Sequence, residues 1–110
     1  MTTSTKKVAL ITGAATGIGR AIAIRLAKDG IVVAVNYVGN PNQADEVVNL
    51  IREAGGTALA FQADVSKVAE ITKLFKEVIN EFGGIDIVVA NAGIAVMGIP
   101  IVDVTEADFD

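Results

Sequence analysis

Glycines at positions 13, 17 and 19 lie in the stretch TGAATGIG, residues 12–19, between an apolar run and a helical pattern. Gly13 can adopt the angles of a sharp turn, Gly17 lets a ligand approach the main chain, and Gly19 lets a helix pack closely on a strand. Free N–H groups and partial positive charge at the start of that helix favour an anion. A diphosphate fits this combination, and a purely structural turn is the alternative.

Other chemistries are excluded by residue types. Arg20 and Ala21 follow Gly19, where a P-loop requires Lys and then Ser or Thr. The chain has no Cys and no His, which excludes a thiolate nucleophile, a Cys/His zinc site and a histidine base. We therefore expect no metal site of that kind.

Charge and hydropathy bear on partners and location. The net charge is −4 and no basic run occurs, so we expect no nucleic-acid partner. No apolar run reaches the ~18 residues of a membrane span, and the N-terminus lacks a signal-peptide core. The sequence thus predicts a soluble cytoplasmic protein without a membrane partner.

The elements that position the glycines follow from periodicity. Short apolar runs predict strands at 7–12, 31–37, 57–62 and 85–90. Apolar spacings of three and four predict helices at 17–28, from Asn40 to about Ala54, and from a Ser66 cap to Phe82. This alternation predicts an α/β fold with a parallel sheet, in one domain over 7–110 after a disordered polar tail at 1–6.

Three motifs in this order carry a family resemblance. They are TGAATGIG, Asp64-Val65 after the third strand, and Asn91-Ala92-Gly93 after the fourth. The chain resembles the N-terminal, cofactor-binding half of the short-chain dehydrogenase/reductase family, whose motifs are TGxxxGIG, an adenine-contacting pair and NNAG. Ala90 stands in place of the first Asn of NNAG. The resemblance covers about residues 6–110.

The resemblance implies a Rossmann-type doubly wound parallel sheet with strand order 3-2-1-4, truncated after the fourth strand. Ligands of such sheets bind where the strand order reverses, here between the first and fourth strands. The resemblance also implies that Asp64 accepts a hydrogen bond from the adenine amino group and that the Val65 amide contacts the ring. The cofactor-binding residues that we predict are Gly13, Thr16, Gly17, Ile18, Gly19, Asn36, Tyr37, Asp64, Val65, Asn91, Ala92 and Gly93.

Two residues are predicted to be structural. The Thr12 hydroxyl is expected to bond across to the Asn91 turn, and Asp86 to make a hydrogen bond near the start of the fourth strand. Arg20 is expected to be solvated, or else to add positive potential near a phosphate.

The end of the second strand bears on the choice of cofactor. No carboxylate occurs between Asp29 and Asp45, which removes the acidic residue that binds the ribose 2′-hydroxyl of NAD. No Lys or Arg is present there either, and Thr16 stands where NADP-preferring relatives often carry a basic residue. We favour NADP over NAD.

No catalytic residue can be assigned. In the family a Tyr, assisted by a Lys, transfers a proton, and both lie beyond the fourth strand. The only tyrosine here is Tyr37, and Pro41 occupies the position where Tyr-x-x-x-Lys would need Lys. We therefore expect the chain to be inactive alone.

The predicted function is the NAD(P)-binding portion of an oxidoreductase. Its complete form would transfer hydride between a nicotinamide and an alcohol or ketone, as in 3-oxoacyl-reductase-like members of the family. The alternative is a non-catalytic half-domain that needs no ligand. In either case we expect self-association, through an apolar edge at 85–90 and an apolar segment at 94–102.

Overall fold

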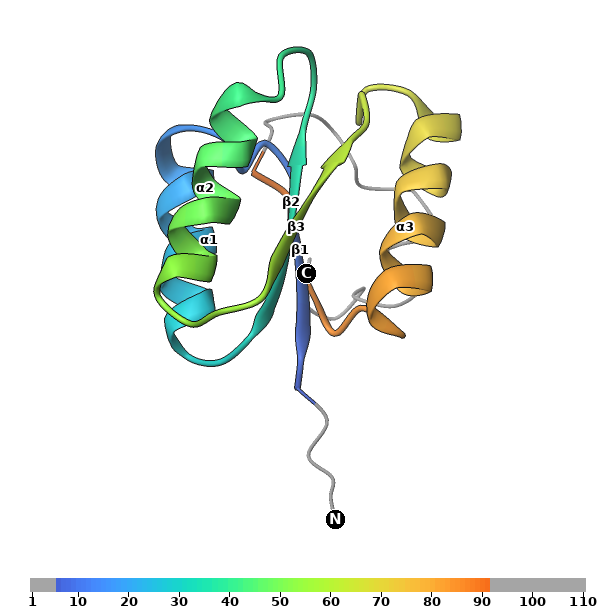
Figure 1. Cartoon of the computed structure of the whole chain (residues 1–110). Coiled ribbons are helices and arrows are strands. Elements are labelled where there is room, and N and C mark those ends of the chain that lie inside the picture. The colour runs from blue at the N-terminus through green and yellow to red at the C-terminus, as the bar shows by residue number, and fades with distance from the viewer. Residues whose placement is uncertain (1–5, 92–110) are drawn as a thin grey trace.

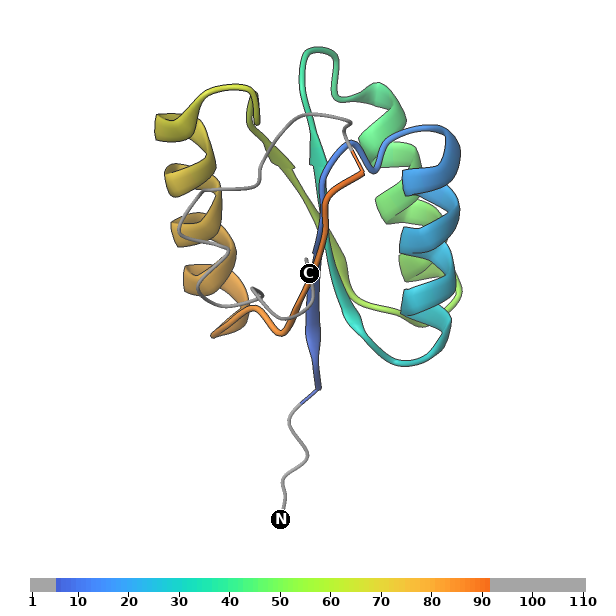
Figure 2. The same ribbon diagram turned by 180° about the vertical axis from the view of Figure 1, so that it is seen from behind.

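The computed structural model describes residues 6–91. Its elements are β1 (Val8–Ile11), α1 (Gly17–Lys28), β2 (Val32–Tyr37), α2 (Asn42–Glu53), β3 (Ala58–Gln62), α3 (Val68–Phe82) and β4 (Ile87–Val89). The strands form one parallel sheet in the order β3-β2-β1-β4, which confirms the predicted fold class and strand order. Figure 1 shows α1 and α2 covering one face of this sheet and α3 the other, and Figure 2 shows the same layers from behind.

Each face of the sheet has its own hydrophobic core. Val8, Leu10 and Val32 pack against α3, whereas Ile11 and Val33 pack against α1 and α2. Neighbouring strand residues point to opposite faces, so strands covered on both sides read as unbroken apolar runs. This explains why the sequence shows continuous runs of Val, Ile, Leu and Ala in place of an apolar–polar alternation.

The starts of α2 and α3 differ from the predicted ones. Pro41 and not Asn40 is the residue before α2, although the Asn40 side chain accepts a hydrogen bond from the Asn42 amide at 2.7 Å. Helix α3 begins at Val68, two residues after the predicted cap Ser66, because the Ser66 hydroxyl donates to Asp64 Oδ1 at 2.6 Å instead of capping the helix.

Strand β4 is shorter than the predicted 85–90. Asp86 precedes it and exchanges two hydrogen bonds with Val8: its amide donates to the Val8 carbonyl, and its carboxylate accepts from the Val8 amide, both at 2.8 Å. The predicted structural hydrogen bond of Asp86 is therefore confirmed, and the carboxylate replaces a main-chain partner just before the strand.

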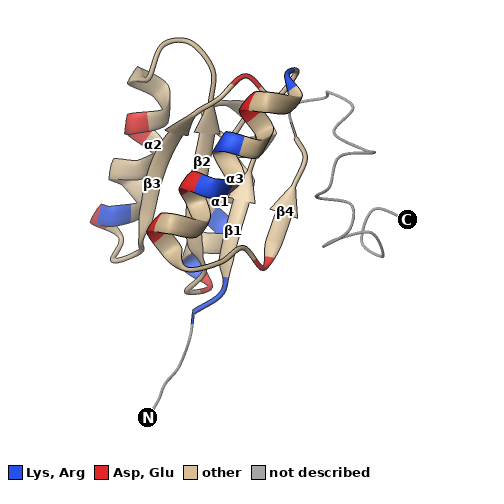
Figure 3. Cartoon of the chain, turned by 90° about the vertical axis from the view of Figure 1, so that its right-hand side faces the viewer, with Lys and Arg blue, Asp and Glu red and all other residues tan. Residues whose placement is uncertain are grey.

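The surface of the described residues is mixed in charge. Figure 3 shows acidic and basic positions interspersed along α2 and α3. Over residues 6–91 no helix is both long and apolar enough to cross a bilayer. The predicted site residues Ala92 and Gly93 and the apolar segment 94–102 lie outside the described residues.

Candidate functional site

The predicted site residues that the structure describes lie at the carboxyl ends of the four strands, the upper end of the sheet in Figure 1. All three helices of the described residues begin at this end, because each follows a parallel strand. Open α/β sheets bind ligands at this edge, where the strand order reverses. In this sheet the reversal lies between β1 and β4, so the glycine loop and Asn91, which follow these two strands, flank the expected ligand position.

The start of α1 is built from the glycine loop and carries no cap. Gly13 and Gly17 have φ values of +61° and +59°, a region that glycine adopts readily. Thr16 precedes the helix but makes no side-chain capping hydrogen bond, and the first turn contains no acidic residue. The first amides of a helix have no acceptor within it, and they carry partial positive charge. The loop therefore offers N–H donors that suit an anion.

The surroundings of this loop leave room for a ligand. Thr16, Gly17 and Ile18 are exposed, and a Cβ added at Gly17 would meet no atom within 4 Å. Ile18 keeps 72% of its surface exposed, which is unusual for so large an apolar side chain. The predicted close approach of a ligand to Gly17 is thus sterically possible.

Gly19 lies where three parts of the chain converge. A Cβ at this position would collide with the Gly13 carbonyl oxygen and Asn91 Nδ2, and would lie 3.0 Å from Ala14 Cα. The same Asn91 Nδ2 donates to the Gly13 carbonyl at 3.1 Å. Glycine is therefore required at position 19 because the side-chain amide of Asn91 and the main chain of the glycine loop occupy the space that a side chain would need.

Thr12 and Asn91 tie β1 to the end of β4. The main-chain amide of Asn91 donates to the Thr12 hydroxyl at 2.9 Å, and this hydroxyl donates to the Val89 carbonyl at 3.4 Å. The predicted structural role of Thr12 is confirmed. Ala90 stands where the family motif NNAG has its first Asn, and these bonds form without that Asn side chain.

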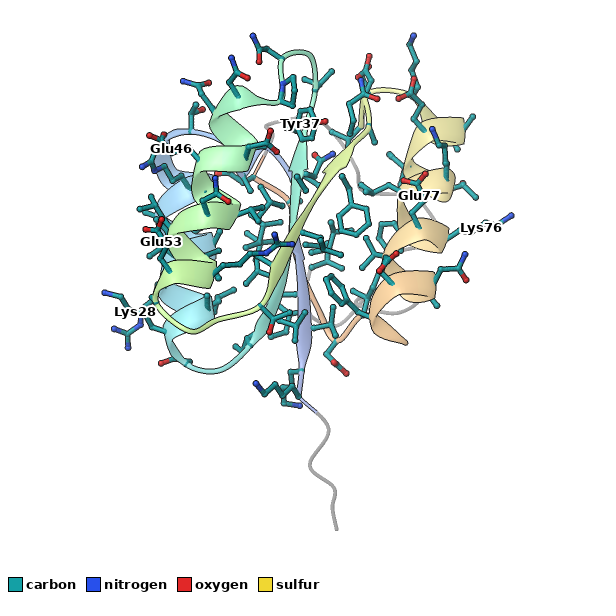
Figure 4. All side chains as sticks on the ribbon, viewed as in Figure 1. Lys28, Tyr37, Glu46, Glu53, Lys76 and Glu77 are labelled. Carbon is teal, nitrogen blue, oxygen red and sulfur yellow. The ribbon has the colours of Figure 1, made fainter. Side chains whose placement is uncertain are left out.

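Asn36 and Tyr37 end β2 on opposite faces of the sheet. Asn36 is only 2% exposed, and both polar atoms of its side chain are hydrogen-bonded within the protein. Tyr37 packs partly against the core beside α1 and α2, and Figure 4 shows it at the upper end of the sheet. The side chain of Asn36 is thus turned into the protein, while that of Tyr37 lies nearer the surface.

The loop after β3 presents a carboxylate. Asp64 Oδ1 accepts hydrogen bonds from the Ser66 hydroxyl and amide, at 2.6 and 3.0 Å. The hydrogen bond from the Ser66 hydroxyl contributes most to holding the pKa of Asp64 below its ordinary value of 3.8, and the bond from the Ser66 amide adds to this effect. Nearby Lys67 also lowers the pKa. Val65 is buried just beside it. Asp64 is therefore ionised at neutral pH and suited to accept a hydrogen bond.

Two residues at this end were not singled out from the sequence. The Glu70 carboxylate, in the first turn of α3, accepts the Asp64 amide at 2.7 Å and so fixes the loop. Glu46 on α2 pairs with Arg20 on α1 at 2.8 Å. Arg20 is consequently engaged in an ion pair as well as partly solvated, a contact between helices that local sequence does not reveal.

Neither a metal-binding cluster nor a neighbouring hollow in residues 6–91 suggests a different candidate site. Residues 6–91 contain no cluster of three or more His, Cys, Asp or Glu able to hold a metal ion. A hollow of about 420 Å³ lies at the opposite end of the sheet, between the carboxyl ends of α1 and α2, lined in part by Ile24, Leu50 and Ile51. It does not adjoin the glycine loop.

Comparison with known proteins gives consistent relatives. A family model described as short chain dehydrogenase matches residues 7–110. A hydroxynaphthalene reductase-like protein, Arp2, of Metarhizium acridum is 51% identical over 104 residues, which cover 94% of this chain and 39% of the relative. Elsinochrome reductase 1 of Elsinoe fawcettii is 48% identical over the same shares. The chain thus spans 39% of the length of these curated relatives.

Solved structures agree with the topology described above. A dehydrogenase/reductase from Sinorhizobium meliloti matches with a TM-score of 0.77 and 44% identity, over 79% of this chain and 34% of the other. A short-chain dehydrogenase/reductase from Serratia marcescens matches with the same TM-score and 39% identity, over 80% of this chain and 36% of the other.

Proposed function

Because the chain belongs to the short-chain dehydrogenase family, we propose that its described residues bind the adenosine diphosphate part of a nicotinamide dinucleotide. The observation that carries this proposal is the start of α1, where no side chain caps the helix and no acidic residue lies in the first turn. A diphosphate would satisfy the free amides and the positive end of the helix together. The open space beside Gly17 gives it access.

The other loops supply the remaining contacts of this proposal. The ionised carboxylate of Asp64 would accept from the adenine amino group, with the Val65 amide on the ring. Tyr37 and Asn36 would lie on the ribose side, and Asn91, whose side chain bonds to Gly13, would border the ligand. Ala92 and Gly93 are predicted to continue that border.

We favour NADP over NAD as the ligand. At the end of β2, residues 36–40 carry no carboxylate that would bind the 2′-hydroxyl of NAD and repel a 2′-phosphate. Replacing Tyr37 by Asp places a carboxylate there. We expect Tyr37→Asp to lower the affinity for 2′-phospho-ADP-ribose by about tenfold relative to that for ADP-ribose.

For the complete protein we propose hydride transfer between a nicotinamide and an alcohol or ketone, of the 3-oxoacyl-reductase kind. Of the two curated relatives described above, one is named a reductase and the other a reductase-like protein, which supports this proposal. The bound nicotinamide would supply the hydride, and the protein would position it. The 110 residues contain no Tyr-x-x-x-Lys pair, so we expect no turnover from this chain alone.

Titration of the chain with NADP, NAD and ADP-ribose tests the binding proposal. Since the contacts proposed for residues 6–91 involve only the adenosine and diphosphate, ADP-ribose should bind as tightly as NAD. Absence of binding by any of the three ligands at millimolar concentration would contradict the proposal.

Self-association is a second proposal. Strand β4 hydrogen-bonds to β1, and all three of its residues are half-exposed, as expected of an apolar edge that can recruit another chain. Light scattering at low micromolar concentration should show a species larger than the 11.3 kDa monomer. A clean monomer with slowly exchanging β4 amides would contradict this.

A further inference from the structure

Asn36 is a buried polar residue whose side chain contacts both candidate ligand loops. Its Oδ1 accepts the Gly13 amide at 3.2 Å, and its Nδ2 donates to the carbonyls of Phe61 and Ala63 at 3.3 and 3.2 Å. Gly13 opens the glycine loop, and Ala63 immediately precedes Asp64. One amide group therefore joins the carboxyl ends of β1, β2 and β3.

The main chain of the same segment extends this junction. The Asn36 carbonyl accepts the Ala14 amide at 2.9 Å, and the Tyr37 carbonyl accepts the Ala63 amide at 2.9 Å. The positive φ of Gly13 turns the chain out of the sheet, and Asn36 Oδ1 gives its amide an acceptor. The side chain thus continues the hydrogen bonding between strands beyond the point where the loops leave the sheet.

The chemistry of this junction requires an amide. Gly13 presents a donor, whereas Phe61 and Ala63 present acceptors, so the bridging side chain must accept on one atom and donate from the other. A carboxylate accepts only, and an aliphatic side chain of similar size would leave all three groups without their partner. Leaving buried polar groups unpaired is costly.

We propose that Asn36 is a positioning residue that fixes the glycine loop relative to the Asp64 loop. The inference rests on the proposed function, since it assigns the diphosphate to one loop and the adenine to the other. Both polar atoms of Asn36 are committed to these loops, so it acts on the ligand through them. A ligand that spans both loops gains from their fixed spacing, because two linked contacts then form together.

The first test uses the 110-residue chain without ligand. Asn36→Asp is nearly isosteric and keeps the acceptor for Gly13 but loses the donations to Phe61 in β3 and to Ala63 in the loop after it. Val35→Ala is the matched control, since Val35 is fully buried in the preceding position of β2 and its side chain makes no hydrogen bond. Amide hydrogen exchange is measured for both variants and for the parent chain.

For Asn36→Asp we expect the amides of Ala63, Asp64 and Ser66 to exchange at least about tenfold faster relative to those of β1. For Val35→Ala we expect hydrogen exchange to become faster by a similar factor at the protected amides of β1 and of the loop after β3, because a cavity in the core lowers global stability. Uniform acceleration in Asn36→Asp would overturn the inference, since Asn36 would then contribute only general stability.

The second test compares two ligands. Inorganic pyrophosphate contacts only the glycine loop in this proposal, whereas ADP-ribose spans both loops. We expect Asn36→Asp to lower ADP-ribose affinity about tenfold and to leave pyrophosphate affinity within about twofold. An equal fall for both ligands, or no fall for ADP-ribose, would overturn the inference. If the parent chain binds neither ligand, the proposed function fails, and hydrogen exchange still decides the role of Asn36.

Discussion

Helices α1 and α3 begin at the same edge of the sheet, each after a parallel strand, yet their first turns are opposite in chemistry. The start of α1 has glycines, no capping side chain and no carboxylate. Just before α3, the Asp64 carboxylate is held by Ser66, and Glu70 in its first turn accepts the Asp64 amide. Neither helix has a side chain that caps its first amides, but only α3 carries a carboxylate, that of Glu70, in its first turn.

This difference shows that the topology of the sheet brings the loops before α1 and α3 to the same edge, whereas the residue types in each loop determine what that loop can bind. Every helix start carries free amides and partial positive charge. At α3 these are offset by Glu70, and the loop instead exposes an acceptor, Asp64. A ligand with an anionic centre and a hydrogen-bond donor at one end matches both loops together, as a diphosphate joined to adenine does.

Closing the space at the start of α1 should have the largest effect. In Gly19→Val the new side chain collides with Gly13 and Asn91, so we expect a loss of about 1–3 kcal/mol in the free energy of unfolding and no dinucleotide binding. Ala21→Val is the control, because it adds the same side chain at an exposed position of α1. Urea unfolding and ligand titration measure the two effects, and normal binding by Gly19→Val would refute the loop assignment.

Making the start of α1 resemble that of α3 should change stability and binding in opposite directions. Ile18→Asp puts a carboxylate in the exposed first turn, which should raise the free energy of unfolding by about 0.3–1 kcal/mol. The same charge repels a diphosphate, so the affinity for ADP-ribose should fall about tenfold at low salt and less at high salt. Ile18→Asn, which lacks the charge, should bind more tightly than Ile18→Asp. Unchanged affinity in Ile18→Asp would show that no anion sits there.

Removing the acceptor near α3 should affect only the adenine end. We expect Asp64→Ala to weaken AMP binding about tenfold and to leave pyrophosphate binding unchanged. Gln62→Ala, an exposed change at the end of β3, serves as the control. Equal binding of AMP by Asp64→Ala and the parent chain would remove Asp64 from the proposed site.

The smallest expected effect is the contribution of Asp64 to acid stability. Its pKa is lowered in the folded chain, so the stabilisation is complete above the ordinary value of 3.8 and is lost as the pH falls through the lower folded value. Asp64→Asn lacks this titration. Urea unfolding from about pH 7 to about pH 2 should therefore show the parent chain losing its advantage over Asp64→Asn only in the acid range. A constant difference across that range would contradict the assignment.

Much of the fold was predictable, because the apolar spacing of neighbouring residues indicates most of the strands and helices in this chain. The interval 17–28 reads as a helix from its apolar spacing, and α1 has those same bounds. The prediction was less accurate where polar side chains bond outside their usual roles. Ser66 was predicted to cap α3 but donates to Asp64. The hydrogen bond of Asp86 was predicted, but β4 begins only after this residue and is shorter than the predicted strand 85–90.

The candidate site was predictable in composition and less so in geometry. The glycine loop was identified from its residues, and Asp64 and Asn91 from the resemblance to the short-chain dehydrogenase family; all three lie at one edge of the sheet. Glu70 was missed, although an acidic residue in a first helical turn is a recognisable local signal. Glu46 was missed because its pairing with Arg20 depends on how α1 packs beside α2.

The amino-acid pattern alone specifies an α/β chain with a parallel sheet, a glycine loop after the first strand and a carboxylate after the third strand, since periodicity and turn residues act over a few neighbours. Tertiary structure decided that Asn91 donates to Gly13, 78 residues away, and so requires glycine at position 19. It also turned Asn36 inward to bridge Gly13 and Ala63. Such bonds depend on where strand ends meet in space, and buried amides must find partners there because water is excluded.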